Sequence, residues 1–211
     1  MKKHLIMAIG LLGLSSLAFA AEPVGTNRVI NDFAEGSISE AEGLENWQKF
    51  YEIASHPRCS NCHVGADNKP IWSGPSYGKT RVHGMNINAG ESRIGAETVP
   101  CSTCHTTLLK PDENANAAAH QAPRVAANWA LAPVEAEWHG KSSSYVCNQL
   151  KDPERNGERT IREVAGHLEH DVILHWAWNP GGDRESAPYS LQESMDFLMK
   201  WAAAGTPCPT S

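Results

Sequence analysis

The sequence lacks an apolar run long enough to cross a membrane and lacks an excess of basic residues. Its longest apolar stretch, from Leu5 to Leu14, is shorter than the ~20 residues that a spanning helix needs. The 18 Lys and Arg face 24 Asp and Glu, which gives a formal net charge of −6. This acidic balance argues against nucleic acid or an anionic membrane as a partner. No acid–base pair or nucleophile constellation stands out, so we do not expect an enzyme.

Cysteine is scarce, but four of the six cysteines stand in two copies of one pattern. Residues 59–63 (CSNCH) and 101–105 (CSTCH) both read Cys-x-x-Cys-His, the attachment signature of a c-type haem. Each thiol can bond one vinyl group at the haem edge, and the histidine that follows can bind the iron as proximal ligand. The sequence therefore predicts two haem c groups, held by Cys59, Cys62, Cys101 and Cys104, with His63 and His105 as iron ligands.

Two other interpretations of these cysteines account for less of the pattern. A Cys₄ zinc site also uses two Cys-x-x-Cys pairs, but it gives no reason for a histidine after both. A thioredoxin-like redox pair stands at a strand-to-helix junction, and neither pair here follows a run of β-branched residues. Haem attachment is the interpretation that explains both histidines.

The N-terminus has the features of a secretory signal peptide. Lys2 and Lys3 precede the apolar run, and Ala18-Phe19-Ala20 is a small-x-small cleavage site. We predict a signal peptide over residues 1–20, cleaved after Ala20, and one dihaem cytochrome c domain over residues 21–211. The alternative, an uncleaved anchor, is disfavoured by the short apolar core. Because bacterial cytochromes c receive their haems after export, we expect the protein in the periplasm.

Hydrophobic periodicity and capping signals predict a mainly α fold. Apolar residues recur at helical spacing over 41–55, before Pro57. Capping boxes begin at Thr160 and Ser190, and predict helices from Ile161 to about Trp178 and from Leu191 to Gly205. Residues 64–100 are rich in Gly and Pro, which predicts an irregular loop and not a packed helix or strand. The expected fold is a loop-rich single domain with few or no strands.

Each low-spin haem needs a distal ligand in addition to the motif histidine. For the first haem His83 is favoured, with Met85 as the alternative. For the second haem His167 is favoured over His170, which lies three residues later on the same predicted helix face. Asp171, four residues after His167, is placed to orient that imidazole. Three further histidines fit surface or capping roles better than ligation: His56, His120 and His139.

Two cysteines remain outside the motifs. Cys147 lies in a short helix predicted over 142–150, and Cys208 follows the last predicted helix. Two leftover thiols in an exported protein normally join, so we predict a Cys147–Cys208 disulfide, the alternative being two buried thiols. In the chain-entropy model, closing a loop of about 60 residues stabilises the fold by roughly 4 kcal/mol.

Beyond the motifs, the chain resembles a family of exported dihaem proteins known as cytochrome c-like. The stretches that carry this resemblance cover most of the mature chain: 56–59 with the first motif, 81–85, 129–133, 151–153 with 156–157, 176–182, and Cys208-Pro209. Some members of that family are associated with molybdenum-containing aldehyde or isoquinoline oxidoreductases and pass on their electrons. The resemblance therefore implies a redox protein partner such as a periplasmic dehydrogenase, and another cytochrome is the alternative.

The expected function is electron transfer. A haem with both axial positions filled reorganises little when it changes oxidation state, and two haems attached 42 positions apart, at Cys59 and Cys101, must be close neighbours. Loss of Lys2 and Lys3 with the signal would take the net charge from −6 to −8, which suits a partner with a basic patch. The alternatives are a peroxidase-like dihaem enzyme or gas or redox sensor with one open iron position, and a haem subunit that scaffolds a larger dehydrogenase.

Overall fold

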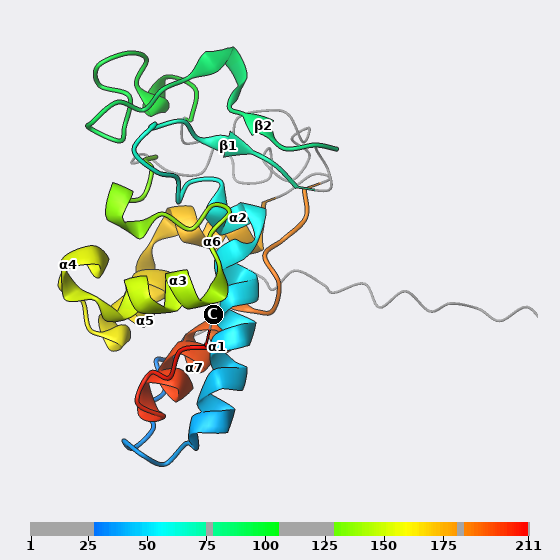
Figure 1. Cartoon of the computed structure of the whole chain (residues 1–211). Coiled ribbons are helices and arrows are strands. Elements are labelled where there is room, and N and C mark those ends of the chain that lie inside the picture. Colours follow the sequence, from blue (N-terminus) through cyan, green and yellow to red (C-terminus); the bar gives the residue numbers. More distant parts are fainter. Residues whose placement is uncertain (1–27, 75–77, 106–128, 181–183, 211) are drawn as a thin grey trace, which may run out of the picture.

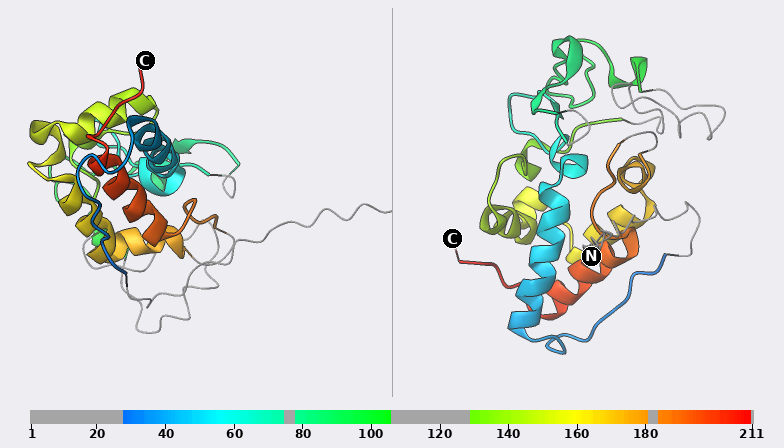
Figure 2. Two further views of the ribbon diagram at one scale, coloured as in Figure 1. Left: turned by 90° about the horizontal axis from the view of Figure 1, so that it is seen from below. Right: turned by 90° about the vertical axis from the view of Figure 1, so that its right-hand side faces the viewer.

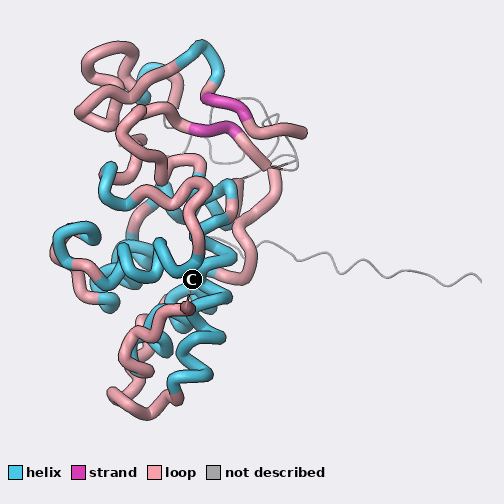
Figure 3. Tube along the Cα trace, viewed as in Figure 1, coloured by secondary structure: helices cyan, strands magenta, loops and turns pink. Residues whose placement is uncertain are grey.

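The structure, a computed structural model, describes residues 28–74, 78–105, 129–180 and 184–210. Within these ranges the predicted mainly α, loop-rich fold is confirmed: helices fill one half, and loops with two short strands fill the other (Figure 3). No helix in these ranges is both long enough and apolar enough to span a bilayer. The predicted signal peptide and His120 lie outside the described residues.

The α-helices are α1 (Glu40–Ser55), α2 (Pro57–Ser60), α3 (Ser143–Lys151), α4 (Pro153–Asn156), α5 (Ile161–His170), α6 (Val172–Trp178) and α7 (Leu191–Ala203). The strands are β1 (Ile71–Trp72) and β2 (Arg81–Val82), and 3₁₀ turns cover Gly84–Asn86 (η2), Cys101–Thr103 (η3) and Val134–Ala136 (η5). Short connections join α3, α4, α5 and α6, whereas longer irregular segments separate the described elements between α2 and α3 (Figure 1).

Helices α1 and α7 form the centre of the main core, and the views in Figures 1 and 2 agree that they lie side by side. The rings of Trp47 on α1 and Trp201 on α7 are 4.7 Å apart, and both side chains are fully buried. The capping box at Ser190 is present, and the predicted α7 face, which includes Met195 and Leu198, is buried. The helix predictions for these two segments are confirmed.

The prediction of a single helix from Ile161 to about Trp178 is wrong, because two helices, α5 and α6, meet at a break at Asp171. The capping box at Thr160 does start α5, but Asp171 has extended backbone angles and ends it. The Asp171 carboxylate accepts a hydrogen bond from the N–H of Ile173 at 2.8 Å and so caps α6. Aspartate competes with the helix for backbone donors in this way, and apolar periodicity carries no sign of it.

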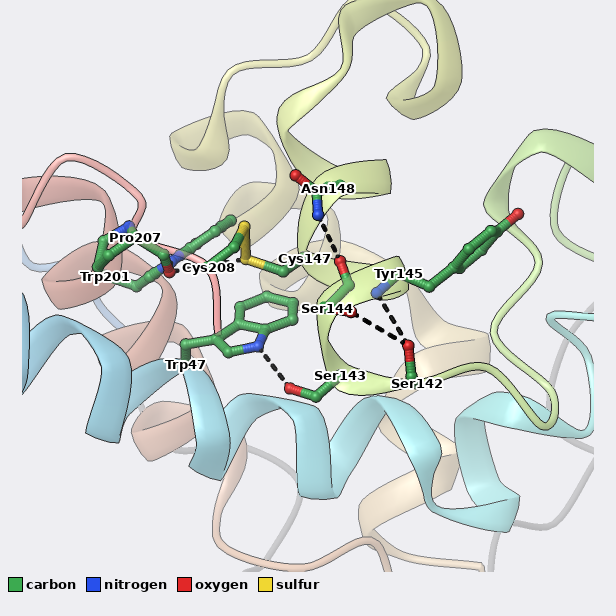
Figure 4. The surroundings of a disulfide bond; sticks show 10 residues. All are labelled: Trp47, Ser142, Ser143, Ser144, Tyr145, Cys147, Asn148, Trp201, Pro207 and Cys208. Atoms are coloured by element: carbon green, nitrogen blue, oxygen red, sulfur yellow. Dashed lines mark hydrogen bonds between the residues drawn. A yellow bond between two sulfur atoms is a disulfide. The ribbon is translucent and has the colours of Figure 1, made fainter. Parts of the chain in front are cut away.

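The predicted disulfide is present (Figure 4). The Cα atoms of Cys147 and Cys208 are 5.7 Å apart, and Cys147 is fully buried on α3. The indole N–H of Trp201 donates to the carbonyl of Pro207 at 2.9 Å. Together these bonds hold the chain after α7 against α3, so the C-terminal segment closes the helical core.

The loop-rich half depends on polar contacts more than on apolar burial. Strands β1 and β2 pair antiparallel, with Ile71 opposite Val82. A small apolar cluster has three buried members: Val64, Ala89 and Leu131. Beside it, the Arg93 guanidinium donates to the carbonyls of Val64, Gly65 and Ala132 and to the Asn68 side chain, at 2.7–3.0 Å. Arg93 therefore ties the loop after the first motif to the segment that ends at Pro133.

Candidate haem-attachment site

The two Cys-x-x-Cys-His motifs adopt the same backbone turn. In both, the N–H groups of the second cysteine and of the histidine donate to the carbonyl of the first cysteine. These distances are 3.1 and 3.2 Å at Cys59, and 3.2 and 2.9 Å at Cys101. A helical turn places positions i, i+3 and i+4 on one face. The backbone of each motif therefore favours placing both thiols and the imidazole on one side of the turn. Of the two thiols in the first motif, Cys62 lines the cavity described below, while Cys59 packs against the main helical core.

Each motif histidine stacks on an indole. The rings of His63 and Trp138 are 3.5 Å apart and inclined by 8°; those of His105 and Trp129 are 4.4 Å apart and inclined by 5°. Parallel stacking at these distances restricts rotation of both imidazoles. The sequence analysis missed Trp138 because it lies in no periodic segment, and only the fold brings it beside the first motif.

A hydrogen bond determines which ring nitrogen of His63 carries the proton. Its Nδ1 lies 2.8 Å from the carbonyl oxygen of Ala136, so a proton on Nδ1 donates to that oxygen. Nε2 then carries the lone pair, which is the arrangement of a metal-binding imidazole. Burial lowers the pKa of His63 to about 4, and the ring is neutral at physiological pH, the form that binds metal.

The thiols of the first motif are held in their uncharged form. Burial raises the pKa of Cys59 to about 12 and that of Cys62 to about 11, and the neighbouring Cys101 raises the pKa of Cys62 further. A redox-active Cys-x-x-Cys pair needs a cysteine with a lowered pKa. The raised pKa values of Cys59 and Cys62 therefore argue against a role for this pair as a catalytic dithiol.

A cavity of about 350 Å³ joins the two motifs. Cys62 lines it from the first motif, and Cys101, Cys104 and His105 line it from the second. The rest of its wall is mainly apolar and includes Ile71, Trp72, Ile87, Val99, Trp129 and Leu131. Apolar walls around a few polar groups are typical of a cofactor site.

His83 and His105 both line this cavity. Their ring centres are 6.1 Å apart, with an interplanar angle of 55°. Imidazole–metal bonds are about 2 Å long and a ring nitrogen is about 1 Å from the ring centre, so two imidazoles that share one metal ion have centres about 6 Å apart. The Nδ1 of His83 lies 2.9 Å from the carbonyl of Gly84, which leaves Nε2 with the lone pair. The pair fits a six-coordinate haem iron.

The structure thus brings His83 to the second motif, whereas the sequence analysis assigned it to the first haem. The cause is the path of the loop. Strand β2 folds back on β1, and the N–H of Cys101 donates to the carbonyl of Ile94 at 2.9 Å. The second motif is thereby returned to the segment that carries His83. Met85, the alternative ligand, lines the same cavity but is 77% exposed.

His167 lies on the side of the first motif. Its positive charge is among the causes, after burial, that lower the pKa of His63, so the two imidazoles are within electrostatic range. Its side chain is 48% exposed, and its Nδ1 lies 3.7 Å from the carboxylate of Asp171, the expected orienting residue. His170, the alternative ligand, is exposed, and its ring centre is 6.2 Å from that of His167.

The weaker histidine candidates have other contacts. His56 caps α2, where its Nδ1 accepts a hydrogen bond from the N–H of Arg58 at 3.2 Å. His139 lines a separate cavity of about 240 Å³ beside Glu137. Both placements agree with the surface or capping roles weighed in the sequence analysis.

Among the side chains that the structure describes, no three His, Cys, Asp or Glu gather around one point as ligands for a metal ion. A haem iron needs only two protein ligands, because the porphyrin supplies the others. Comparisons with protein-family models, curated proteins and solved structures found no match to this chain. The case for a function therefore rests on the geometry of its own residues.

Proposed function

We propose that this protein is an exported dihaem c-type cytochrome, which carries electrons between redox partners by outer-sphere transfer. In this proposal Cys59 and Cys62 hold one haem, and Cys101 and Cys104 hold the other. Haem supplies an iron centre that changes its charge by one electron. The chain's own residues attach that centre, fill its axial positions and exclude water from it.

The observation that carries the proposal is the pairing of His83 with His105. Their 6.1 Å separation is the spacing of two imidazoles on one iron, and they line the cavity that three motif cysteines also line. Thiols for covalent attachment and two axial nitrogens are thus gathered at one apolar site. For the first haem the proposed axial ligands are His63, from the motif, and His167, which lies within electrostatic range of it.

Rigid imidazoles suit electron transfer better than substrate chemistry. Stacking on Trp138 and Trp129 holds the two motif histidines, so the ligand geometry changes little with the charge of the iron. With both axial positions filled, no site remains for substrate. A closed, rigid site supports a carrier over the alternative, a peroxidase-like enzyme or sensor with one open iron.

The proposed partner is a redox protein with a basic surface, such as a periplasmic dehydrogenase or another cytochrome. The acidic composition supports this, since complementary charge mainly raises the rate of encounter. The signal peptide pattern over residues 1–20 supports export to the periplasm, where haem is attached in bacteria.

The test is to express the full chain in a bacterium that attaches haem c, and to measure haem per chain by the pyridine haemochrome method. Two haems are expected. The double variant Cys101→Ala, Cys104→Ala is the matched control and should hold one. Colourless wild-type protein would refute the proposal.

A second measurement separates carrier from enzyme or sensor. Carbon monoxide is added to the reduced protein, and the Soret band is followed. An unchanged spectrum is expected, because both irons are closed. A shifted band in the wild-type protein would favour the open-iron alternative.

A further inference from the structure

Trp176 on α6 presents a buried hydrogen-bond donor for which the described part of the chain supplies no acceptor. The side chain is 9% exposed and lines the cavity between the motifs. Its Nε1–H has no partner among the described residues. A buried indole N–H normally finds an acceptor, and because Trp176 lines the cavity, a group bound in the cavity is placed to supply it.

The surroundings of Trp176 connect this donor to the second motif. Its ring meets that of Trp129 edge to face, with centres 5.6 Å apart, and Trp129 stacks on His105. The missing acceptor therefore belongs to whatever occupies the cavity beside His105, and not to a remote part of the surface.

The charge near Trp176 indicates what kind of acceptor fits. The Arg58 guanidinium carbon lies 5.0 Å from the centre of the Trp176 ring, and Arg58 lines the same cavity. The Arg58 side chain is 2% exposed. The backbone carbonyl of Glu185 accepts from its Nε at 2.7 Å, and the Glu185 carboxylate lies 3.3 Å from its Nη2. A guanidinium has several N–H donors and can bind more than one anion. An indole, which only donates, beside a buried guanidinium suits an anionic oxygen such as a carboxylate.

On the basis of the proposed function, we infer that Trp176 and Arg58 bind a propionate of the haem attached at Cys101 and Cys104. The two propionates are the only carboxylates of a haem, whose remaining surface is largely apolar. The Trp176 N–H donates to the propionate oxygen, and the Arg58 charge stabilises the anion. In this arrangement Trp176 and Arg58 form the polar end of the cavity and bind the propionate, while the cysteines attach the haem and the histidines bind its iron.

The test compares Trp176→Phe with Trp178→Phe in the haem-loaded full chain. Trp178 is a matched control: it lies on the same helix, is 8% exposed, and its Nε1–H likewise has no partner among the described residues. It is not among the residues that line the cavity. Both variants remove an indole N–H and keep an aromatic ring.

Two readouts are independent of electron-transfer activity. The resonance Raman band of the propionate bend reports hydrogen bonding to that group, and it should shift in Trp176→Phe alone. The midpoint potential of one haem should also fall in that variant, because loss of a donor stabilises oxidised iron. The expected fall is up to tenfold in the equilibrium constant for reduction, which is about 59 mV for one electron.

The outcomes separate the two proposals. Two haems in every protein, with the same propionate band in Trp176→Phe as in wild type, would overturn the inference and leave the cytochrome function standing. Absence of haem from the wild-type chain would overturn both. If Trp176→Phe does not fold, NMR of the reduced wild-type protein decides: a nuclear Overhauser contact between the Trp176 indole N–H and propionate protons is expected, and its absence overturns the inference.

Discussion

Replacement of His83 by alanine gives the sharpest test of how the axial ligands are shared. If His83 and His105 bind one iron, as their 6.1 Å separation indicates, His83→Ala opens that iron and no other. The reduced variant should bind one carbon monoxide per chain, at one of its two haems. The wild-type protein should bind none. The fold should survive, because among the described residues the His83 ring makes one hydrogen bond, with the Gly84 carbonyl, worth about 1 kcal/mol.

The same substitution in chains with one haem decides which iron it opens. In a background without the first haem (Cys59→Ala, Cys62→Ala), His83→Ala should allow the remaining haem to bind carbon monoxide. In a background without the second haem (Cys101→Ala, Cys104→Ala), the substitution should change nothing. Titration of the Soret band with carbon monoxide measures both.

The opposite pattern would restore the pairing expected from the sequence alone, in which His83 serves the first haem. Carbon monoxide binding in neither background would refute the axial role of His83 altogether. Met85, exposed at the same cavity, is the next candidate in that case, and its ligation would raise the potential relative to two histidines.

Three further predictions concern the stability of the fold around the site: the disulfide, the Arg93 hydrogen bonds and the His56 helix cap. Replacement of both disulfide cysteines, Cys147→Ala with Cys208→Ala, should lower the free energy of unfolding in urea by roughly 4 kcal/mol, since the bond spans 61 positions. Equal stability of the two proteins would contradict the chain-entropy argument. Arg93→Met should cost about 3 kcal/mol by leaving buried carbonyls without their donor, whereas Arg162→Met, which removes an exposed ion pair, should cost less than about 1 kcal/mol. A similar loss in both variants would refute this role for Arg93. Burial lowers the pKa of His56 below 6.5, so its helix cap contributes fully above pH 6.5 and is lost as the pH falls through the folded-state pKa. The drop in urea midpoint from pH 7.5 to 5.5 should therefore be smaller in His56→Asn, whose amide caps the helix at both values; an equal drop would exclude His56 as the cause.

Local signals in the sequence predict the local structure of this protein well. The capping boxes at Thr160 and Ser190 and the apolar spacing on α7 are properties of a few neighbouring residues, and each has its expected place in the fold. The break at Asp171 was missed, because apolar periodicity runs through it and the competing side-chain cap does not alter that pattern. The disulfide was predictable by elimination, since only two cysteines stood outside the motifs.

The residues that gather at the cavity could be named from the sequence in part, but which of them face one another could not. For the proposed haem site, the motifs indicate the thiols and the proximal histidines, because attachment chemistry would fix their spacing along the chain. Distal ligands have no such constraint, and the partner of His83 depends on how the 83–101 loop closes. The same holds for Trp138 and Arg93, whose roles arise from contacts between segments far apart in sequence.

The division of the molecule into two halves follows from where its apolar residues lie. The helical half buries a cluster with Trp47, Met195 and Trp201 at its centre and is further closed by the disulfide. Among the residues described in the loop-rich half, a cluster of three buried apolar side chains is too small to offset the entropy of ordering so much irregular chain. What it has instead is a cavity of about 350 Å³ with apolar walls, motif thiols and paired imidazoles. A haem in that cavity would serve as a core for these segments, so the group proposed to carry electrons would also account for the little regular structure in the described part of this half.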